Sequence, residues 1–304
     1  MQLKDLINKK KNLNNINLKV SNERNIFLIN IMKLNQRLTF FSKNAFEIKE
    51  SILSLKRIYN IKHDMLRHEE RKIFKFLNKI NDRVLWIYLT EEQKYSTDSY
   101  SRYEQKILET IKSNRDDFIL IGQGAIEFGK NHNLNILQTF NDSNIKNLTT
   151  QLTKMIMILY TFDNYKKVNF VINSNKNYDG HFTILPMNEF SFDKFINLEK
   201  CDSNIIDFQK VKIYPNLNEF INVQINVFLV NIINTLITES SFYKTKNGLV
   251  ATNNILKELD DNLSKIQRKI TRVKTELQIE EINLLARQNM NEDDNDNDGG
   301  VYES

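Results

Sequence analysis

The residue spacing best suited to chemistry lies at 124–130, where Gly124, Gly129 and Lys130 complete the pattern GxxxxGK after an apolar run. A phosphate-binding loop of this pattern needs glycines for close backbone approach, a lysine for the β and γ phosphates, and a following Ser or Thr for Mg²⁺. Here the following residue is Asn, and Glu127 would bring a carboxylate against the phosphates. We therefore favour a structural strand–turn–helix unit. A small P-loop NTPase that uses Gly124 to Lys130 is kept as the alternative.

Two further patterns have the residue types of a site but lack its geometry. Residues 122–127 (GQGAIE) hold two glycines of a dinucleotide-binding fingerprint, but the first expected strand–helix turn (TEEQK) has no glycine. The acidic pairs Glu91/Glu92 and Asp116/Asp117 are neighbours in sequence, so their side chains point in different directions. Surface solvation explains them better than acid–base chemistry. No GxSxG motif occurs either, so the sequence predicts no catalytic residue and no directly bound cofactor.

Metal and disulfide chemistry also lack the residues they need. The chain has one cysteine, Cys201, and four histidines at 63, 68, 132 and 181 that match no metal-ligand spacing. A single cysteine suits a reducing cytoplasm. Neither a run of 18 apolar residues nor an apolar signal core occurs. We expect a cytoplasmic protein that is peripheral to a membrane only through its complex.

The composition favours long helices. Only 7 Gly and 2 Pro occur in 304 residues, far fewer than an average usage of roughly 7% and 5% would give. Sandwiches, barrels and propellers need many tight turns and are therefore disfavoured. The 43 Asn residues, with abundant Ile and Lys, are typical of AT-rich codon usage.

Charge is distributed unevenly along the chain. The net charge is only +5, but residues 1–80 hold 18 Lys and Arg against 7 Asp and Glu, and no basic residue follows Arg287. A basic helix presents a solvated face or meets an acidic partner. Lys9, Lys10 and Lys11 sweep around the helix rather than marking one face, so no nucleic acid is expected. A basic coiled-coil scaffold that binds nucleic acid is kept as an alternative.

Hydrophobic periodicity divides the chain into three zones and a tail. Apolar residues recur at helical spacing in residues 1–80 and again in 215–289, which predicts two long helices. Such helices would pair into an antiparallel coiled coil, because pairing buries both apolar stripes. Residues 290–304 are acidic and poor in hydrophobic residues, so we expect a disordered tail.

Residues 81–214 alternate short apolar runs with amphipathic stretches. The pattern predicts strands near 84–89, 118–121, 134–139, 168–172 and 182–185, and helices near 99–113, 124–131 and 143–163. Alternation at this spacing is typical of an open, doubly wound sheet. The predicted fold is therefore α/β plus long helices, with an antiparallel coiled coil of the N- and C-terminal helices and an inserted Rossmann-like open α/β domain.

Three segments carry a resemblance to a known family. Residues 248–254 (GLVATNN) are similar to the segment MxxATxNA, and residues 274–282 (KTELQIEEI) are similar to ITxELxEI. Near the N-terminus, Asn12 and Ile16 fit the spacing of NTxKIT. Together with the order of helix, α/β insert and longer helix, these segments resemble the gamma subunit, or central stalk, of F-type rotary ATPases.

The chain also departs from that family. Its first strand–helix turn is acidic rather than glycine-rich, and the family's Glu-x4-Arg-Met segment is reduced to Glu239 and Lys244. The resemblance therefore fits an ordinary ATP synthase and a specialised F-type-like ATPase equally well.

The resemblance implies a non-catalytic rotor subunit that couples ATP hydrolysis or synthesis in an alpha/beta hexamer to rotation. It implies alpha and beta ATPase subunits as partners, with one copy of this chain per hexamer, and an epsilon-like subunit and a membrane ring as further candidates. ATP or ADP and Mg²⁺ would be bound by the partner subunits. The residues that it assigns to hexamer contact are Lys9, Lys10, Lys11, Lys33, Arg37, Thr252, Asn254, Arg268, Lys269, Arg272, Leu277, Ile279 and Ile282.

Overall fold

The structure is a computed structural model that describes residues 3–59, 61, 63–66, 83–92, 100–111, 115–143, 145, 147–163, 165–176, 180–196 and 212–296. The chain forms two compact units. The helical unit consists of Met1–Ile26 and Leu249–Ser304, and the sheet unit consists of Phe27–Gly248. Helix α1 (Leu3–Tyr59) and helix α5 (Leu217–Asp296) contribute to both units.

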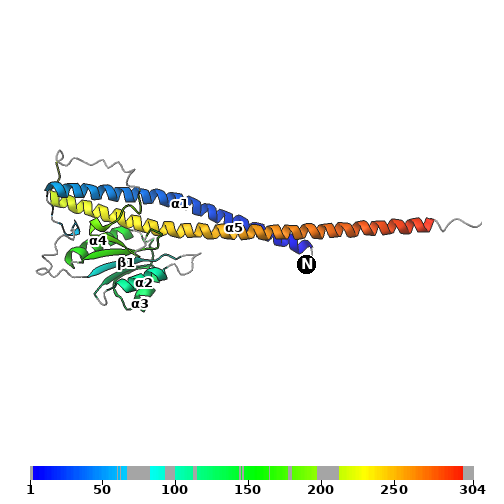
Figure 1. Ribbon diagram of the computed structural model, residues 1–304, viewed down its shortest axis with the longest axis horizontal. Coiled ribbons are helices and arrows are strands. Elements are labelled where there is room, and N and C mark those ends of the chain that lie inside the picture. Colours follow the sequence, from blue (N-terminus) through cyan, green and yellow to red (C-terminus); the bar gives the residue numbers. More distant parts are fainter. Residues whose placement is uncertain are drawn as a thin grey trace, which may run out of the picture. The chain divides into compact units, whose positions relative to one another are not determined.

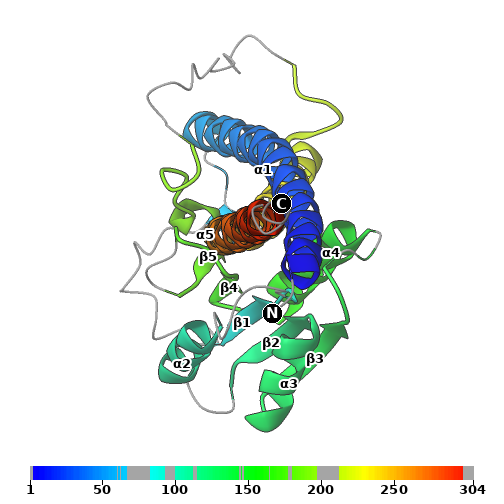
Figure 2. The same ribbon diagram turned by 90° about the vertical axis from the view of Figure 1, so that its right-hand side faces the viewer.

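The sheet unit is built on five strands in the order β3-β2-β1-β4-β5 (Figure 2). Strands occur at each of the five predicted places, as β1 (Val84–Leu89), β2 (Asp117–Ile121), β3 (Asn135–Phe140), β4 (Lys167–Val171) and β5 (Phe182–Leu185). The first four are parallel, and β5 runs antiparallel to β4. Residues 172–181 are too few for the crossover of roughly a dozen residues that a parallel β5 would need. The sheet is therefore mixed.

Helices cover both faces of the sheet (Figure 1). On one face, α2 (Ser101–Thr110) and α3 (Gln123–Asn131) share a core with Trp86 and Tyr88 of β1. On the other face, α4 (Leu148–Phe162) and the α1 and α5 segments of this unit share a core with Leu85, Ile87 and Leu89. This division follows from the two-residue period of a strand.

Within the sheet unit, α1 and α5 also pack on each other. Ala45 and Ile52 of α1 belong to the same core as Ile225 and Phe228 of α5. Gly248 of α5 lies under a ring of α1, since a Cβ at this position would be 2.7 Å from the Phe27 ring. The glycine that interrupts the helical pattern in the sequence thus permits close approach of the two helices.

In the helical unit, α1 and α5 form an antiparallel pair. Lys10 Nζ donates to Gln267 Oε1 at 2.6 Å, and Asn17 Nδ2 donates to Asp260 Oδ1 at 2.7 Å, so later residues of α1 meet earlier residues of α5. From Thr252 to Val273, the buried or half-buried positions of α5 other than Ile255 follow the alternating spacing of four and three residues that defines a coiled-coil seam. These positions are Thr252, Leu256, Leu259, Leu263, Ile266, Ile270 and Val273. The predicted antiparallel coiled coil is therefore present in this unit.

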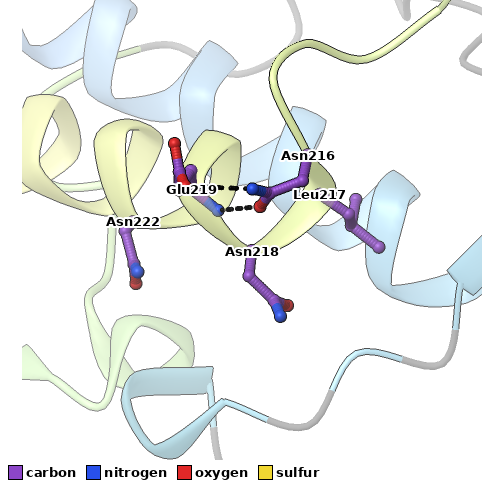
Figure 3. Close-up of a pocket in the computed structure, with 5 residues that line it drawn as sticks. All are labelled: Asn216, Leu217, Asn218, Glu219 and Asn222. Carbon is purple, nitrogen blue, oxygen red and sulfur yellow. Dashed lines mark hydrogen bonds between the residues drawn. The ribbon is translucent and has the colours of Figure 1, made fainter.

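Helix α5 begins at a capped end. The Asn216 side chain accepts a hydrogen bond from the Glu219 backbone N–H at 2.9 Å and donates one to the Glu219 carboxylate at 3.0 Å (Figure 3). The first bond satisfies one backbone donor that would otherwise have no partner at the start of the helix, and the second holds the Asn216 side chain in position.

The ends of the two long helices differ in part from the predicted boundaries. Helix α1 ends at Tyr59, and residues 67–80 of the expected helix lie outside the described residues. Helix α5 continues to Asp296, so the first residues of the expected tail at 290–304 are helical, as each added residue extends an existing helix by one hydrogen bond. Residues 297–304 lie outside the described residues.

One segment of α5 is apolar and long enough to span a membrane by length and composition alone, with a mean hydropathy of 1.7 over 18 residues. Half of that segment is buried inside the protein, as in a core helix, so it is weak evidence for a span. Within the described ranges, no second helix meets the same test.

Candidate functional site

The GxxxxGK segment does not form a phosphate-binding loop. Residues 123–131 are the helix α3, so Gly124, Gly129 and Lys130 are helical rather than wrapped around an anion. Gly129 is a packing position, because a Cβ there would overlap the Leu120 side chain. The turn itself is made by Gly122 alone, with φ of 93° and ψ of 154°. The interpretation as a structural strand–turn–helix unit is confirmed.

Gly122 is the glycine whose backbone conformation the fold requires. Replacing it by Ala should lower the free energy of unfolding by at least about 2 kcal/mol, since this φ/ψ region is essentially restricted to glycine. The added methyl group would also overlap the Thr90 carbonyl oxygen. Denaturant unfolding of Gly122→Ala beside Gly124→Ala measures the effect, because Gly124 lies within helix α3 and a Cβ there would meet only the Thr90 side chain, at 3.3 Å. Equal stability of the two variants would contradict a required left-handed turn.

The acidic pair Asp116/Asp117 is buried, which corrects the prediction of surface solvation. Asp117 is fully buried and accepts hydrogen bonds from Arg83, Asn135 and Tyr165. Asp116 accepts from the Val84 backbone at 3.0 Å and from the Trp86 indole at 3.2 Å. These hydrogen bonds connect the start of β2 to the neighbouring strands. The acidic pair therefore has a structural role.

The surroundings of Asp117 also change the chemistry of its neighbour. Burial, followed by the hydrogen bond to Asp117, raises the pKa of the Tyr165 hydroxyl well above its usual value. Tyr165 therefore stays protonated and donates to the carboxylate. A proton held this way supports packing rather than acid–base catalysis.

A second set of charges lies at the carboxyl edge of the sheet. Glu91 was also predicted to be solvated, but its side chain is only 7% exposed and lies 3.6 Å from Lys244 Nζ of α5. Glu239 of α5 is paired with Lys176, which follows β4. Sequence reasoning missed both pairs, although a carboxylate at the end of the most apolar stretch of α5 was a usable signal.

Basic residues of the helical unit lie on both of its helices. Lys9 and Lys11 of α1 are exposed, and Lys10 contacts Gln267, which immediately precedes Arg268 and Lys269. Arg268, Lys269, Arg272 and Asn254 are exposed on α5. The structure thus brings the predicted basic residues of the two chain ends to one stretch of the helix pair.

Thr252 does not belong to this exposed set. Its side chain is fully buried and donates to the Leu249 carbonyl at 3.0 Å. Its place in the coiled-coil seam of α5 explains the burial, so contact between Thr252 and a partner subunit is not supported.

In the sheet unit, Lys33 and Arg37 are exposed on α1. Large apolar side chains of the same helix are also exposed in this unit, namely Leu28, Ile29, Met32, Phe40, Ile58 and Tyr59. Basic and apolar side chains thus share the exposed positions of α1 in this unit.

The end of α5 has no partner helix in the described part of the chain. Val273 packs beside the cluster of Leu6, Ile266 and Ile270, which also includes Leu3 at the start of α1. After Val273, α5 continues past the chain end that is labelled N in Figure 1. Large apolar side chains on this extension are 47–64% exposed, namely Leu277, Ile279, Ile282, Leu284 and Leu285.

The described residues form a shallow hollow and no group of side chains suited to a metal ion. The hollow at the start of α5 in Figure 3 is shallow and is lined by Asn216, Leu217, Asn218, Glu219 and Asn222. Where the chain is described, no group of three or more His, Cys, Asp or Glu side chains could hold a metal ion. The surfaces on the two long helices are therefore the best candidates for function.

Comparison with known sequences gives one near-identical relative. No family model matches the chain. The chain is 99% identical over all 304 residues to the uncharacterized protein UU050 of Ureaplasma parvum serovar 3 (strain ATCC 700970), whose full length it covers. It belongs to the same family as that protein.

Solved structures with similar folds are chains of mitochondrial ATP synthases. A chain of the Euglena gracilis rotor in rotational state 1 has a TM-score of 0.44 and 10% identity, covering 90% of this chain and 98% of that chain. A chain of the Euglena gracilis OSCP/F1/c-ring structure in rotational state 3 has a TM-score of 0.46 and 9% identity, covering 99% and 98%. A chain of the Tetrahymena thermophila central stalk/c-ring has a TM-score of 0.39 and 14% identity, covering 73% and 98%. All three TM-scores are below 0.5.

Proposed function

We propose that this chain is a non-catalytic central-stalk subunit that couples ATP turnover in an alpha/beta-type hexamer to rotation, in an ATP synthase or in a specialised F-type-like ATPase. The observation that carries the proposal is the C-terminal part of α5, which runs beyond its partner helix and exposes large apolar side chains. Exposed apolar surface of this extent marks an interaction site. A hexamer with an apolar bearing around the shaft would cover Leu277, Ile279 and Ile282.

The coiled coil supports the same role. A shaft must resist bending, and a two-stranded seam gives stiffness that a single helix lacks. The basic residues around Lys10 and Arg268 would meet acidic levers of the catalytic subunits. Exposed ion pairs contribute only about 0–1 kcal/mol each, so such contacts can be exchanged as the shaft turns.

We assign ATP or ADP and Mg²⁺ to the partner subunits. The helical state of residues 123–131 supports this assignment, since it removes the phosphate-binding loop from the segment with GxxxxGK spacing. An epsilon-like subunit and a membrane ring are further proposed partners, and the chain would then be cytoplasmic and peripheral to the membrane.

Affinity purification of the full chain from its native cells tests the proposal. We expect alpha- and beta-type ATPase subunits to be recovered at three copies each per copy of this chain, with ATP hydrolysis present in the complex and absent from the isolated chain. Recovery of the chain without ATPase subunits after mild cross-linking would contradict the proposal, and so would ATP hydrolysis by the chain alone.

A further inference from the structure

The sheet has the topology that usually creates a ligand-binding crevice. From β1 the chain moves to β2 and β3 on one side, and then crosses to β4 on the other side. The carboxyl ends of β1 and β4 are neighbours, since Tyr88 of β1 pairs with Val171 of β4. In open α/β sheets, ligands bind outside the carboxyl ends of the strands at such a switch point.

Helix α5 places a carboxylate at this switch point. Glu239 is only 2% exposed. Its Oε1 accepts a hydrogen bond from Ser174 Oγ at 2.6 Å, and its Oε2 lies 3.0 Å from Lys176 Nζ. Both partners follow β4, so they form the side of the crevice at the carboxyl end of β4, which we call the β4 lip.

The residues that receive Glu239 are themselves held in place. The Tyr103 hydroxyl donates to the Ser174 carbonyl at 2.7 Å and accepts from the Ser174 N–H at 3.1 Å. The Lys176 backbone N–H donates to Ser174 Oγ at 3.0 Å. Since Ser174 and Tyr103 are buried, this lip is a preformed carboxylate receptor rather than a surface ion pair.

The opposite side of the crevice, at the carboxyl end of β1, is the β1 lip. It carries the negative charge of Glu91, where the β4 lip carries the positive charge of Lys176. Glu91 accepts a hydrogen bond from Ser241 Oγ at 3.0 Å and lies 3.6 Å from Lys244 Nζ. Its backbone N–H donates to the Tyr100 hydroxyl at 2.9 Å. Glu239 and Ser241 point about 200° apart around a helix of 3.6 residues per turn. Helix α5 therefore presents a different side to each lip.

We infer that the ligand crevice of the doubly wound sheet is occupied by this chain's own α5, with Glu239 as an internal carboxylate ligand of Ser174 and Lys176. Two ion pairs across the crevice thereby join the sheet to the long helix. In one pair the helix supplies the carboxylate, and in the other it supplies the amine. Helix α5 carries a carboxylate to the β4 lip and an amine to the β1 lip, which fixes its position along the crevice. This inference does not depend on the proposed rotor function.

Acetate tests the inference directly, because Glu239→Ala removes a CH₂–COO⁻ fragment that acetate can replace. We expect the variant to melt on the order of 10 °C below the unmodified chain, since an unpaired Lys176 remains at a largely buried site. Sodium acetate should then raise its melting temperature saturably, with a dissociation constant in roughly the millimolar range for so small a ligand. Sodium chloride at the same ionic strength is the control.

A double variant, Glu239→Ala with Lys176→Ala, keeps the Ser174 hydroxyl but lacks the cation of the receptor, so most of the difference between acetate and chloride should disappear. Equal responses to the two salts in Glu239→Ala would overturn the inference, and so would an acetate effect that persists undiminished in the double variant. If Glu239→Ala fails to fold, Glu239→Gln provides the second readout. Because Gln lacks the carboxylate charge that holds Lys176, amide exchange at residues 172–176 should accelerate at least tenfold. Unchanged exchange would refute the proposed connection between α5 and the end of β4.

Discussion

Replacing Asp117 by Ala should lower the free energy of unfolding of the chain by about 3–5 kcal/mol, the range for breaking a buried ion pair by removing one partner. Asp117 is completely buried and serves three donors, Arg83, Asn135 and Tyr165. Its loss leaves the Arg83 guanidinium without its carboxylate and the Tyr165 hydroxyl without its acceptor. The unpartnered Tyr165 hydroxyl accounts for about 1–3 kcal/mol of this total.

Denaturant unfolding followed by tryptophan fluorescence measures this change, since Trp86 lies in the same sheet and its indole donates to the adjacent Asp116. The matched control is Asp163→Ala, because Asp163 is an exposed aspartate of the same unit. Its replacement should change stability by no more than about 0.5 kcal/mol. Similar effects of the two replacements would mean that Asp117 is solvated, as the sequence alone predicted.

The Asp117 prediction also shows where sequence patterns stop being informative. Strand β2 was found from the apolar run that ends at Ile121, since a parallel strand buried on both faces reads as continuous hydrophobic sequence. The sequence pattern leaves Asp117 out of this strand, since an adjacent acidic pair is better explained by surface solvation than by burial. The pairing partners Arg83 and Tyr165 are 34 and 48 positions away in sequence. No local pattern could place them beside Asp117.

The same limit explains what was missed on α5. Helical periodicity locates the helix, but it does not show how many sides of the helix are buried along its length. In the sheet unit, consecutive residues from Thr238 to Ser240 are all buried, because α5 packs there against α1 and against the carboxyl edge of the sheet. In the helical unit, the buried positions narrow to a seam, since α1 is the only helix beside it in the described part of that unit. The width of the buried stripe on a helix therefore depends on how many other elements pack against that helix.

The narrow seam and the free end of α5 lead to the prediction with the largest functional effect. Replacing both Leu277 and Ile282 by Asp should prevent stable assembly with the proposed hexamer while leaving the isolated chain intact. Both side chains are exposed, at 47% and 64%, and surface changes of this kind alter stability by about 0.5 kcal/mol or less. Full burial of such side chains contributes about 1.5–3 kcal/mol each. Losing both should therefore weaken association by roughly a hundredfold or more.

The measurement is the recovery of ATPase subunits with each tagged variant, together with ATP hydrolysis in the recovered material. Gln278→Asp combined with Asn283→Asp is the matched control, since these exposed polar residues lie beside Leu277 and Ile282 on the same helix. It introduces the same negative charge without removing apolar surface, so it should preserve recovery. Loss of assembly in both variants would indicate charge repulsion rather than an apolar bearing. Normal assembly of the Leu277/Ile282 variant would show that this end of α5 has no role in the complex, because a shaft held by an apolar collar cannot tolerate two carboxylates in place of its contact residues.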